Sequence, residues 1–297
     1  MPDSQTHGKA CAVRETIAFS DRARNLPVTG ARGSLRRALI VNADDWGRDG
    51  DTTDRISECY ARGALSAVSG MVFMEDSERA ARLALERQVD VGLHLNLTTR
   101  FSGPAVPSKL SLHQEKIAAY LLCRRLSQVI FHPGLTHSFE YVVAAQIDEF
   151  RRLYGSDPSR IDGHHHMHLA ANVLLQGLLP RGIIVRRNFT FRAGEKSFIN
   201  RTYRRTVDAW LGRRYQLVDL LFSIEPVADR KRLQKIVELA QDSVVELETH
   251  PVNGNEYQFL IRSGLAECSE SSPVASSFGS ILKGSMNTGV SSEVSRA

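Results

Sequence analysis

Residues 38–47 read Ala38-Leu39-Ile40-Val41-Asn42-Ala43-Asp44-Asp45-Trp46-Gly47. The apolar run from Ala38 to Val41 predicts a buried β-strand, and two adjacent carboxylates, Asp44 and Asp45, follow it. Like charges this close raise each other's pKa unless a cation or a proton lies between them. The stretch therefore indicates a buried strand that ends at a site where positive charge is held.

Strand-like segments alternate with helical patterns along the chain. Strands are expected at 38–43, 65–73, 89–95, 159–163, 182–186, 216–222 and 243–249. Helices are expected at 51–62, 76–87, 138–154, 168–179, 197–212 and 227–240. This alternation predicts an α/β protein of parallel βαβ units, either an open doubly wound sheet or a closed barrel of about seven strands. The interval 96–137 is long for a loop, so we expect it to cover part of the fold.

Composition predicts an ordinary globular chain with two tails. Of the 297 residues 42% are hydrophobic and 24% are charged, and the net charge is +5. We expect a poorly ordered arm at 1–35, one domain at 36–268 and a flexible, serine-rich tail at 269–297. The four cysteines are widely spaced, and no apolar run approaches the roughly 18 residues of a membrane span. These features predict free thiols and a cytoplasmic location.

Unusual polar residues follow five of the expected strands. In parallel α/β folds the active site forms where the carboxyl ends of the strands meet. The residues at these positions are Asp44 and Asp45, His94, the segment Asp162-Gly163-His164-His165-His166-Met167-His168, Arg186, and His250. Their recurrence at one end of the strands predicts a single polar site.

The histidine run favours metal binding at that site. If residues 164–168 are helical, His164 and His168 share a face; if they are extended, Asp162, His164, His166 and His168 do so. One Asp can coordinate a divalent ion, whose charge keeps the neighbouring carboxylate anionic. Mixed Asp and His ligands suit zinc, whereas an all-oxygen site favours magnesium. An ion with an open position can activate water for hydrolysis of an amide or ester, with the second Asp as base.

Five motifs in this order resemble the YdjC-like carbohydrate deacetylases, which include the chitooligosaccharide deacetylases. They are Asn42-Ala43-Asp44-Asp45-Trp46-Gly47, Gly92-Leu93-His94-Leu95-Asn96-Leu97-Thr98, Ile161-Asp162-Gly163-His164-His165-His166-Met167-His168, Gly182-Ile183-Ile184-Val185-Arg186 and Glu246-Leu247-Glu248-Thr249-His250-Pro251. The resemblance covers roughly residues 37–265. It implies a deformed (β/α) barrel of about seven strands, one divalent metal ion (Mg²⁺ or Zn²⁺), and removal of the acetyl group from an N-acetylated sugar.

The resemblance also implies roles for individual residues. Asp45, His94 and His164 match the metal ligands, Asp44 the general base and His250 the acid that protonates the departing amine. Arg186 is expected to orient Asp44. The residues expected to support the ligands or contact substrate are Asp162, His166, His168 and Trp46.

Other interpretations stay open at this point. Residues 99–137 and 194–215 diverge from the family pattern, so the sugar is undefined, and it could be linked to a lipid or nucleotide carrier. The basic stretch from Arg201 to Arg214 could meet a pyrophosphate or form an exposed helix face. Alternatives are an inactive carbohydrate-binding or regulatory homologue and a metallo-phosphoesterase on a similar barrel. The sequence has no recognisable nucleic-acid module, and it is compatible with a homodimer.

Overall fold

The strand expected at Ala38 is observed as β1 (Ala38–Trp46), and every one of its residues is buried. In the computed structural model it lies between β2 (Ala67–Gly70) and β7 (Val244–Thr249) and pairs with both in parallel. The structure describes residues 37–124, 126–191, 195–262, 264–268 and 277–278. All of them belong to the unit formed by residues 33–297. The expected arm at 1–35 lies outside the described residues.

All seven expected strands are present in one parallel sheet. The other four are β3 (Val91–Leu95), β4 (Arg160–Gly163), β5 (Ile184–Val185) and β6 (Leu220–Ser223), and the order is β5-β4-β3-β2-β1-β7-β6. A bridge between Ile184 and Gln216 joins the edge strand β5 to the segment that leads into β6. The sheet therefore curls back towards itself, which confirms a deformed (β/α) barrel and excludes the open-sheet alternative.

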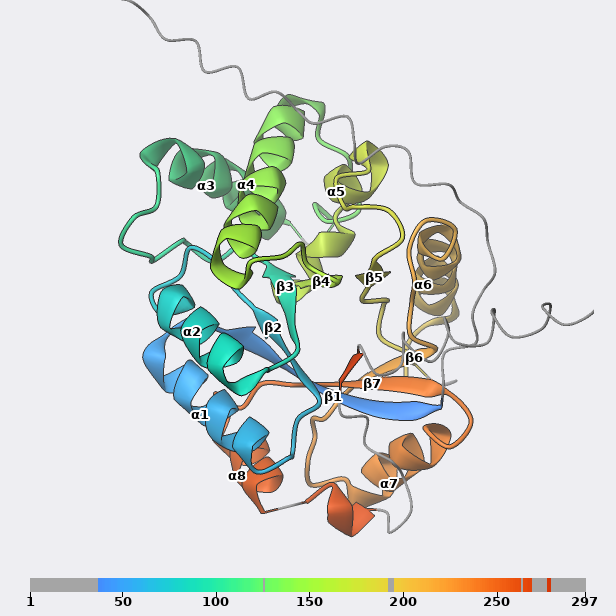
Figure 1. Cartoon of the computed structure of the whole chain (residues 1–297). Helices are drawn as coiled ribbons and strands as arrows, with labels where there is room; N and C mark the ends of the chain where they lie inside the picture. The colour runs from blue at the N-terminus through green and yellow to red at the C-terminus, as the bar shows by residue number, and fades with distance from the viewer. Residues whose placement is uncertain (1–36, 125, 192–194, 263, 269–276, 279–297) are drawn as a thin grey trace, which may run out of the picture. The chain divides into compact units, whose positions relative to one another are not determined.

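Helices follow the strands and lie around the curled sheet (Figure 1). The six expected helices are α1 (Gly50–Ala61), α2 (Ser77–Arg87), α4 (Thr136–Tyr154), α5 (Ala171–Gln176), α6 (Phe198–Leu211) and α7 (Arg230–Leu239). Two more, α3 (Ser108–Cys123) and α8 (Gly254–Ile261), and the short turns η2 (Pro133–Leu135), η3 (His164–Leu169) and η4 (Ala266–Cys268) were not expected. Within the described ranges, no helix has the length and apolar character needed to span a bilayer.

Helix α3 supplies the cover expected over the interval 96–137. Its buried face carries Leu110 and Ile117, but the position between them is Gln114. The Gln114 amide is buried and accepts a hydrogen bond from the Phe101 N–H at 3.3 Å. A polar residue on the buried face weakens the apolar periodicity from which a helix is predicted, which explains why the sequence did not reveal α3.

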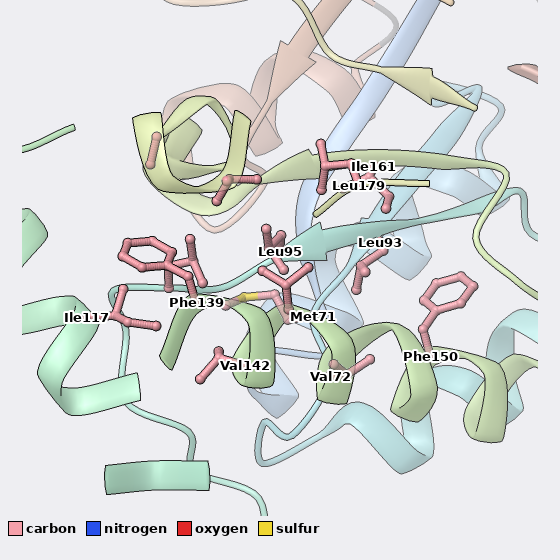
Figure 2. Close-up of a cluster of buried hydrophobic side chains, with 14 of the residues drawn as sticks. Met71, Val72, Leu93, Leu95, Ile117, Phe139, Val142, Phe150, Ile161 and Leu179 are labelled. Atoms are coloured by element: carbon pink, nitrogen blue, oxygen red, sulfur yellow. The ribbon is translucent and has the colours of Figure 1, made fainter. Parts of the chain in front are cut away.

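Alternate residues of the strands enter different cores, as the two-residue period of a strand requires. On β1, Leu39 and Val41 pack outwards against helices, while Ile40 packs inside the curled sheet. A second outer core joins β3 and β4 to the helices on their side, where Leu93 lies near Phe150 (Figure 2). Inward-facing strand residues that do not belong to the inner apolar cluster can therefore be polar.

The floor of the barrel is closed by an apolar cluster. Its members are Ala38, Ile40, Ala67, Ile184, Val218, Val244 and Phe278. The Phe278 side chain is 3% exposed, and the guanidinium carbon of Arg160 lies 4.5 Å from its ring centroid. A Cβ atom at Gly92 would collide with the Arg160 side chain, so a glycine at this position is needed to leave room for Arg160. Phe278 lies in the segment from residue 269 that was expected to be a flexible tail, and its burial was not expected.

We predict that Phe278→Ala lowers the free energy of unfolding by about 3 kcal/mol, because it removes a buried aromatic ring and leaves a cavity. Urea denaturation measures this change. Phe198→Ala is the matched control, since Phe198 is 73% exposed, and it should change the stability by less than about 0.5 kcal/mol. Equal effects of the two substitutions would show that Phe278 does not close the floor.

Candidate active site

The backbone turns the adjacent carboxylates Asp44 and Asp45 towards one place. In a regular strand, neighbouring side chains point to opposite faces. Here the register with β2 shifts between Ala43 and Trp46, and Asp45 has a φ of +70°. Aspartate is one of the few residues besides glycine that adopts this left-handed conformation. As a result, Asp44 Oδ2 lies 3.9 Å from His94 Nδ1, and Asp45 Oδ1 lies 3.4 Å from His94 Nε2.

Two arginines neutralise the carboxylate pair. Arg186 donates from Nη1 to Asp44 Oδ2 at 2.6 Å and from Nη2 to Asp44 Oδ1 at 2.8 Å. Arg48 Nη1 donates to Asp45 Oδ2 at 2.6 Å. The positive charge inferred from the sequence is thus supplied in part by the chain itself. The contact of Arg186 with Asp44 was expected, whereas that of Arg48 with Asp45 was not.

Arg186 is the positive centre of a cluster of buried acids. Besides Asp44, it contacts Glu246 at 2.7 Å, Glu248 at 3.0 Å and Asp162 at 3.1 Å. Although burial disfavours its charge, these carboxylates hold the pKa of Arg186 well above its ordinary value. Burial raises the pKa of Glu246 to about 7. Burial acts in the same sense on Glu248, but its electrostatic interactions with His166 and Arg186 outweigh burial and lower its pKa to about 2.

Asp45, His94 and His164 bring three potential metal ligands together. One donor atom from each lies within 4.8 Å of the other two, and His164 Nδ1 is 3.0 Å from Asp45 Oδ1. His94 Nδ1 donates to Asp162 Oδ1 at 2.7 Å, which turns Nε2 of the same ring towards Asp45. This buried Nε2 atom makes no hydrogen bond with the described residues.

The charges around these three residues also suit a cation. Burial disfavours the His94 imidazolium, but the charge of Asp44, the hydrogen bond with Asp162 and the nearby Asp45 carboxylate hold the pKa of His94 well above its ordinary value. Burial also disfavours the Asp45 carboxylate, yet the hydrogen bond with His164 and the nearby imidazole of His94 lower its pKa. The raised pKa of His94 reflects the negative charge of the carboxylates around its ring, which a proton or a divalent ion at His94 Nε2 would balance.

The histidine run is neither a regular helix nor a strand. His165 and His166 have φ values of +54° and +57°, so the chain reverses between His164 and His168. His164 faces Asp45, whereas buried His168 donates from Nε2 to the carbonyl oxygen of Arg186 at 2.9 Å. Burial lowers the pKa of His168 to about 3, so it is a neutral donor that supports Arg186. Both alternatives for the run are therefore wrong, and His168 does not share a site with His164.

His166 and His250 lie on the side of the site next to β7. His166 Nε2 is 3.3 Å from Glu248 Oε2. His250 Nε2 is 3.9 Å from Asp44 Oδ2, and its side chain is 31% exposed. The backbone N–H of His250 donates to Glu256 Oε2 at 2.6 Å. His250 is therefore the partly solvent-accessible imidazole beside Asp44.

The structure places Trp46 apart from these residues. Its side chain is 1% exposed and belongs to the outer core with Ile56 and Ala80. A residue enclosed in this core does not contact substrate, so we correct that part of the expectation for Trp46. Its packing in this core holds the carboxyl end of β1 in place.

Sequence reasoning missed five polar residues that shape the site: Asn42, Arg48, Ser69, Glu246 and Glu248. Asn42 Nδ2 donates to Asp44 Oδ1 at 2.9 Å and to Ser69 Oγ at 2.8 Å. A signal existed for the glutamates, because Glu246 and Glu248 alternate along an apolar strand and so share one face. Arg48 carried no signal, since its position depends on the turn at Asp45.

The chain belongs to the YdjC-like protein family, whose model matches residues 38–267. It is 32% identical over 146 residues to a chitooligosaccharide deacetylase of Serratia marcescens, covering 47% of this chain and 53% of that protein. It is 31% identical over 141 residues to a carbohydrate deacetylase of Mus musculus, covering 46% and 45%. The chain thus spans about half the length of these relatives.

A solved structure shares the fold. It is a crystal structure of an Enterococcus faecalis V583 protein named for cellobiose-phosphate cleavage, with a TM-score of 0.61, 18% identity, and coverage of 82% of this chain and 98% of that chain. At this identity the likeness concerns the fold alone.

We predict opposite pH effects from the two glutamates of β7 in the metal-free protein. Folded Glu246 keeps its proton up to about pH 7, so the free energy of unfolding falls as the pH rises from about 4.5 to about 7. Folded Glu248 releases its proton near pH 2, so the free energy of unfolding falls as the pH drops from about 4.5 to about 2.

Urea denaturation in the presence of a chelator tests this across the pH range. Glu246→Gln should make the decline above pH 4.5 shallower, and Glu248→Gln should make the decline below it shallower. Each variant serves as the control for the other. Identical pH profiles for the wild type and both variants would contradict the assigned charge states.

Proposed function

We propose that the protein is a metal-dependent hydrolase that removes the acetyl group from an N-acetylated amino sugar. The observation that carries this proposal is the position of Asp44, held by Arg186, directly beside the potential ligands Asp45, His94 and His164. Relatives named as chitooligosaccharide and carbohydrate deacetylases support the substrate class.

The proposed metal ligands are Asp45, His94 and His164. Two imidazoles and one carboxylate suit Zn²⁺ and leave a coordination position open, while Mg²⁺ is the alternative with its preference for oxygen ligands. Held by these residues, a divalent ion would supply Lewis-acid activation of water and of the amide carbonyl at neutral pH. The Nε2 atom of His94, which makes no hydrogen bond with the described residues, and the buried carboxylates around it support this assignment.

Asp44 is the proposed general base. Arg186 donates a hydrogen bond to each of its oxygens, so the carboxylate has a fixed orientation beside Asp45. Water attacks the acetyl carbon, and Asp44 takes the proton that this water loses. Glu246, Glu248 and Asp162 hold Arg186 from the other sides and so keep the base in place.

His250 is the proposed acid. The carbon–nitrogen bond breaks as His250 delivers a proton to the departing amine, and the products are acetate and the free amino sugar. Its partial exposure would allow contact with substrate, and its 3.9 Å separation from Asp44 supports the proposal that the two act at one reacting centre. The sugar itself is an oligosaccharide or a carrier-linked unit.

We predict that the purified protein with Zn²⁺ or Mg²⁺ releases acetate from N-acetylglucosamine oligomers or from nucleotide- or lipid-linked N-acetyl sugars. Asp44→Asn should lower the rate by about 10²–10⁴-fold, because the base is lost, and should retain the metal. His94→Ala and His164→Ala should lose the metal, as measured by elemental analysis. His137→Ala, which changes an exposed histidine outside the site, should retain both metal and activity.

Three results would contradict the proposal. Full turnover by Asp44→Asn would exclude it as the base. Two ions per chain with phosphate release would indicate the metallo-phosphoesterase alternative. Sugar binding without acetate release across the whole panel would indicate an inactive carbohydrate-binding homologue.

A further inference from the structure

The amino-terminal end of α6 exposes large apolar side chains. Phe198 is 73% exposed and Ile199 is 80% exposed, which are the highest values for large hydrophobic residues in the part of the chain that the structure describes. Tyr203, one turn further along, is 45% exposed. The opposite side of the helix is anchored by buried Asp208 and Leu211. Neighbouring apolar side chains this exposed form a candidate surface for binding a partner.

Positive charge is concentrated around the same side chains. Residues 195–214 contain six Lys or Arg and two Asp or Glu, a net charge of +4, against +5 for the whole chain. Asp208 is paired with Arg187 at 2.9 Å on the buried side, so it does not offset the exposed cations. Lys196 and Arg205 are both exposed; Lys196 comes two residues before Phe198, and Arg205 follows Phe198 by seven residues, about two turns of α6. The partner of this surface should therefore combine apolar groups with negative charge.

A line of aromatic contacts links α6 to the candidate active site. The ring of His166 lies 4.6 Å from that of Phe189, which lies 6.3 Å from that of Phe191. Lys196 and Arg204 in turn lie 5.3 Å and 5.1 Å from the Phe191 ring. The basic end of α6 is therefore attached to the same rim of the barrel as the histidine run.

We infer that this surface, formed by Lys196, Phe198, Ile199, Tyr203 and Arg205 and called here the α6 surface, docks on an anionic lipid bilayer. An interfacial helix places apolar side chains at the boundary of headgroups and acyl chains and basic side chains near the lipid phosphates. Phe198 and Ile199 fit the first role, and Lys196 and Arg205 fit the second. A nucleic acid would satisfy the charge but would offer no apolar partner for Ile199.

Docking in this way would bring the rim of the site to the membrane surface. The α6 surface would then favour N-acetyl sugars attached to a lipid over free sugars, a consequence that rests on the proposed deacetylase function. The docking itself does not rest on it, because lipid binding needs neither metal nor turnover.

Co-sedimentation of the full chain with vesicles tests the inference. The wild type should bind vesicles of phosphatidylcholine with about 30% phosphatidylglycerol at about 0.1 M salt, but not vesicles of phosphatidylcholine alone. Phe198→Ser with Ile199→Ser should lower the partition coefficient at least about tenfold. Lys196→Glu with Arg205→Glu should lower it by a similar factor.

Helix α2 offers matched controls, since Leu85 is 58% exposed and Arg82 is exposed on the same helix. Leu85→Ser and Arg82→Glu should bind vesicles like the wild type, and circular dichroism should show every variant folded. No binding by the wild type, or wild-type binding by the Phe198→Ser and Ile199→Ser variant, would overturn the inference. Loss of binding only in the Glu variants, with competition by duplex DNA, would also overturn it in favour of a polyanion surface.

Discussion

The arrangement of the site depends on one buried ion-pair cluster, in which Arg186 faces Asp44, Asp162, Glu246 and Glu248. Four charged acids around one guanidinium would destabilise the fold if they had no other partner, because burial penalises each charge. The repulsion is reduced in two ways. Glu246 keeps its proton up to about pH 7, and a histidine lies next to each of two other acids, His94 beside Asp162 and His166 beside Glu248. Three carboxylates, those of Asp44, Asp45 and Asp162, also lie within 4 Å of the His94 ring, and our account proposes a metal ion at its Nε2 atom.

The Asp44–Asp45 pair is explained by the same constraint. The left-handed backbone at Asp45 is unfavourable by about 1–3 kcal/mol, yet it allows consecutive residues of one strand to face one centre. Each carboxylate then receives its own arginine, Arg186 or Arg48. In our account this separation lets one acid bind a metal ion while the other accepts a proton, although the two are neighbours in the chain.

The sequence predicted the strands, six of the helices and the convergence of Asp44, Asp45, His94, His164, Arg186 and His250, because apolar periodicity and polar strand ends depend on local residue order. It did not predict what depends on individual backbone angles or distant contacts. The path of the histidine run is set by positive φ at His165 and His166. The burial of Phe278 depends on a barrel floor assembled from strands far apart in the chain.

The central claim is that Asp45, His94 and His164 hold the ion while Asp44 stays outside its coordination. Two other groups of donor atoms in the described structure could compete, Asp44 with Glu248 and His250, and Asp44 with His94 and Asp162. Anomalous diffraction from crystals grown with Zn²⁺ distinguishes the three directly. Our account predicts one peak at about 2.0–2.2 Å from Asp45, His94 and His164; a peak coordinated by Asp44 would contradict it.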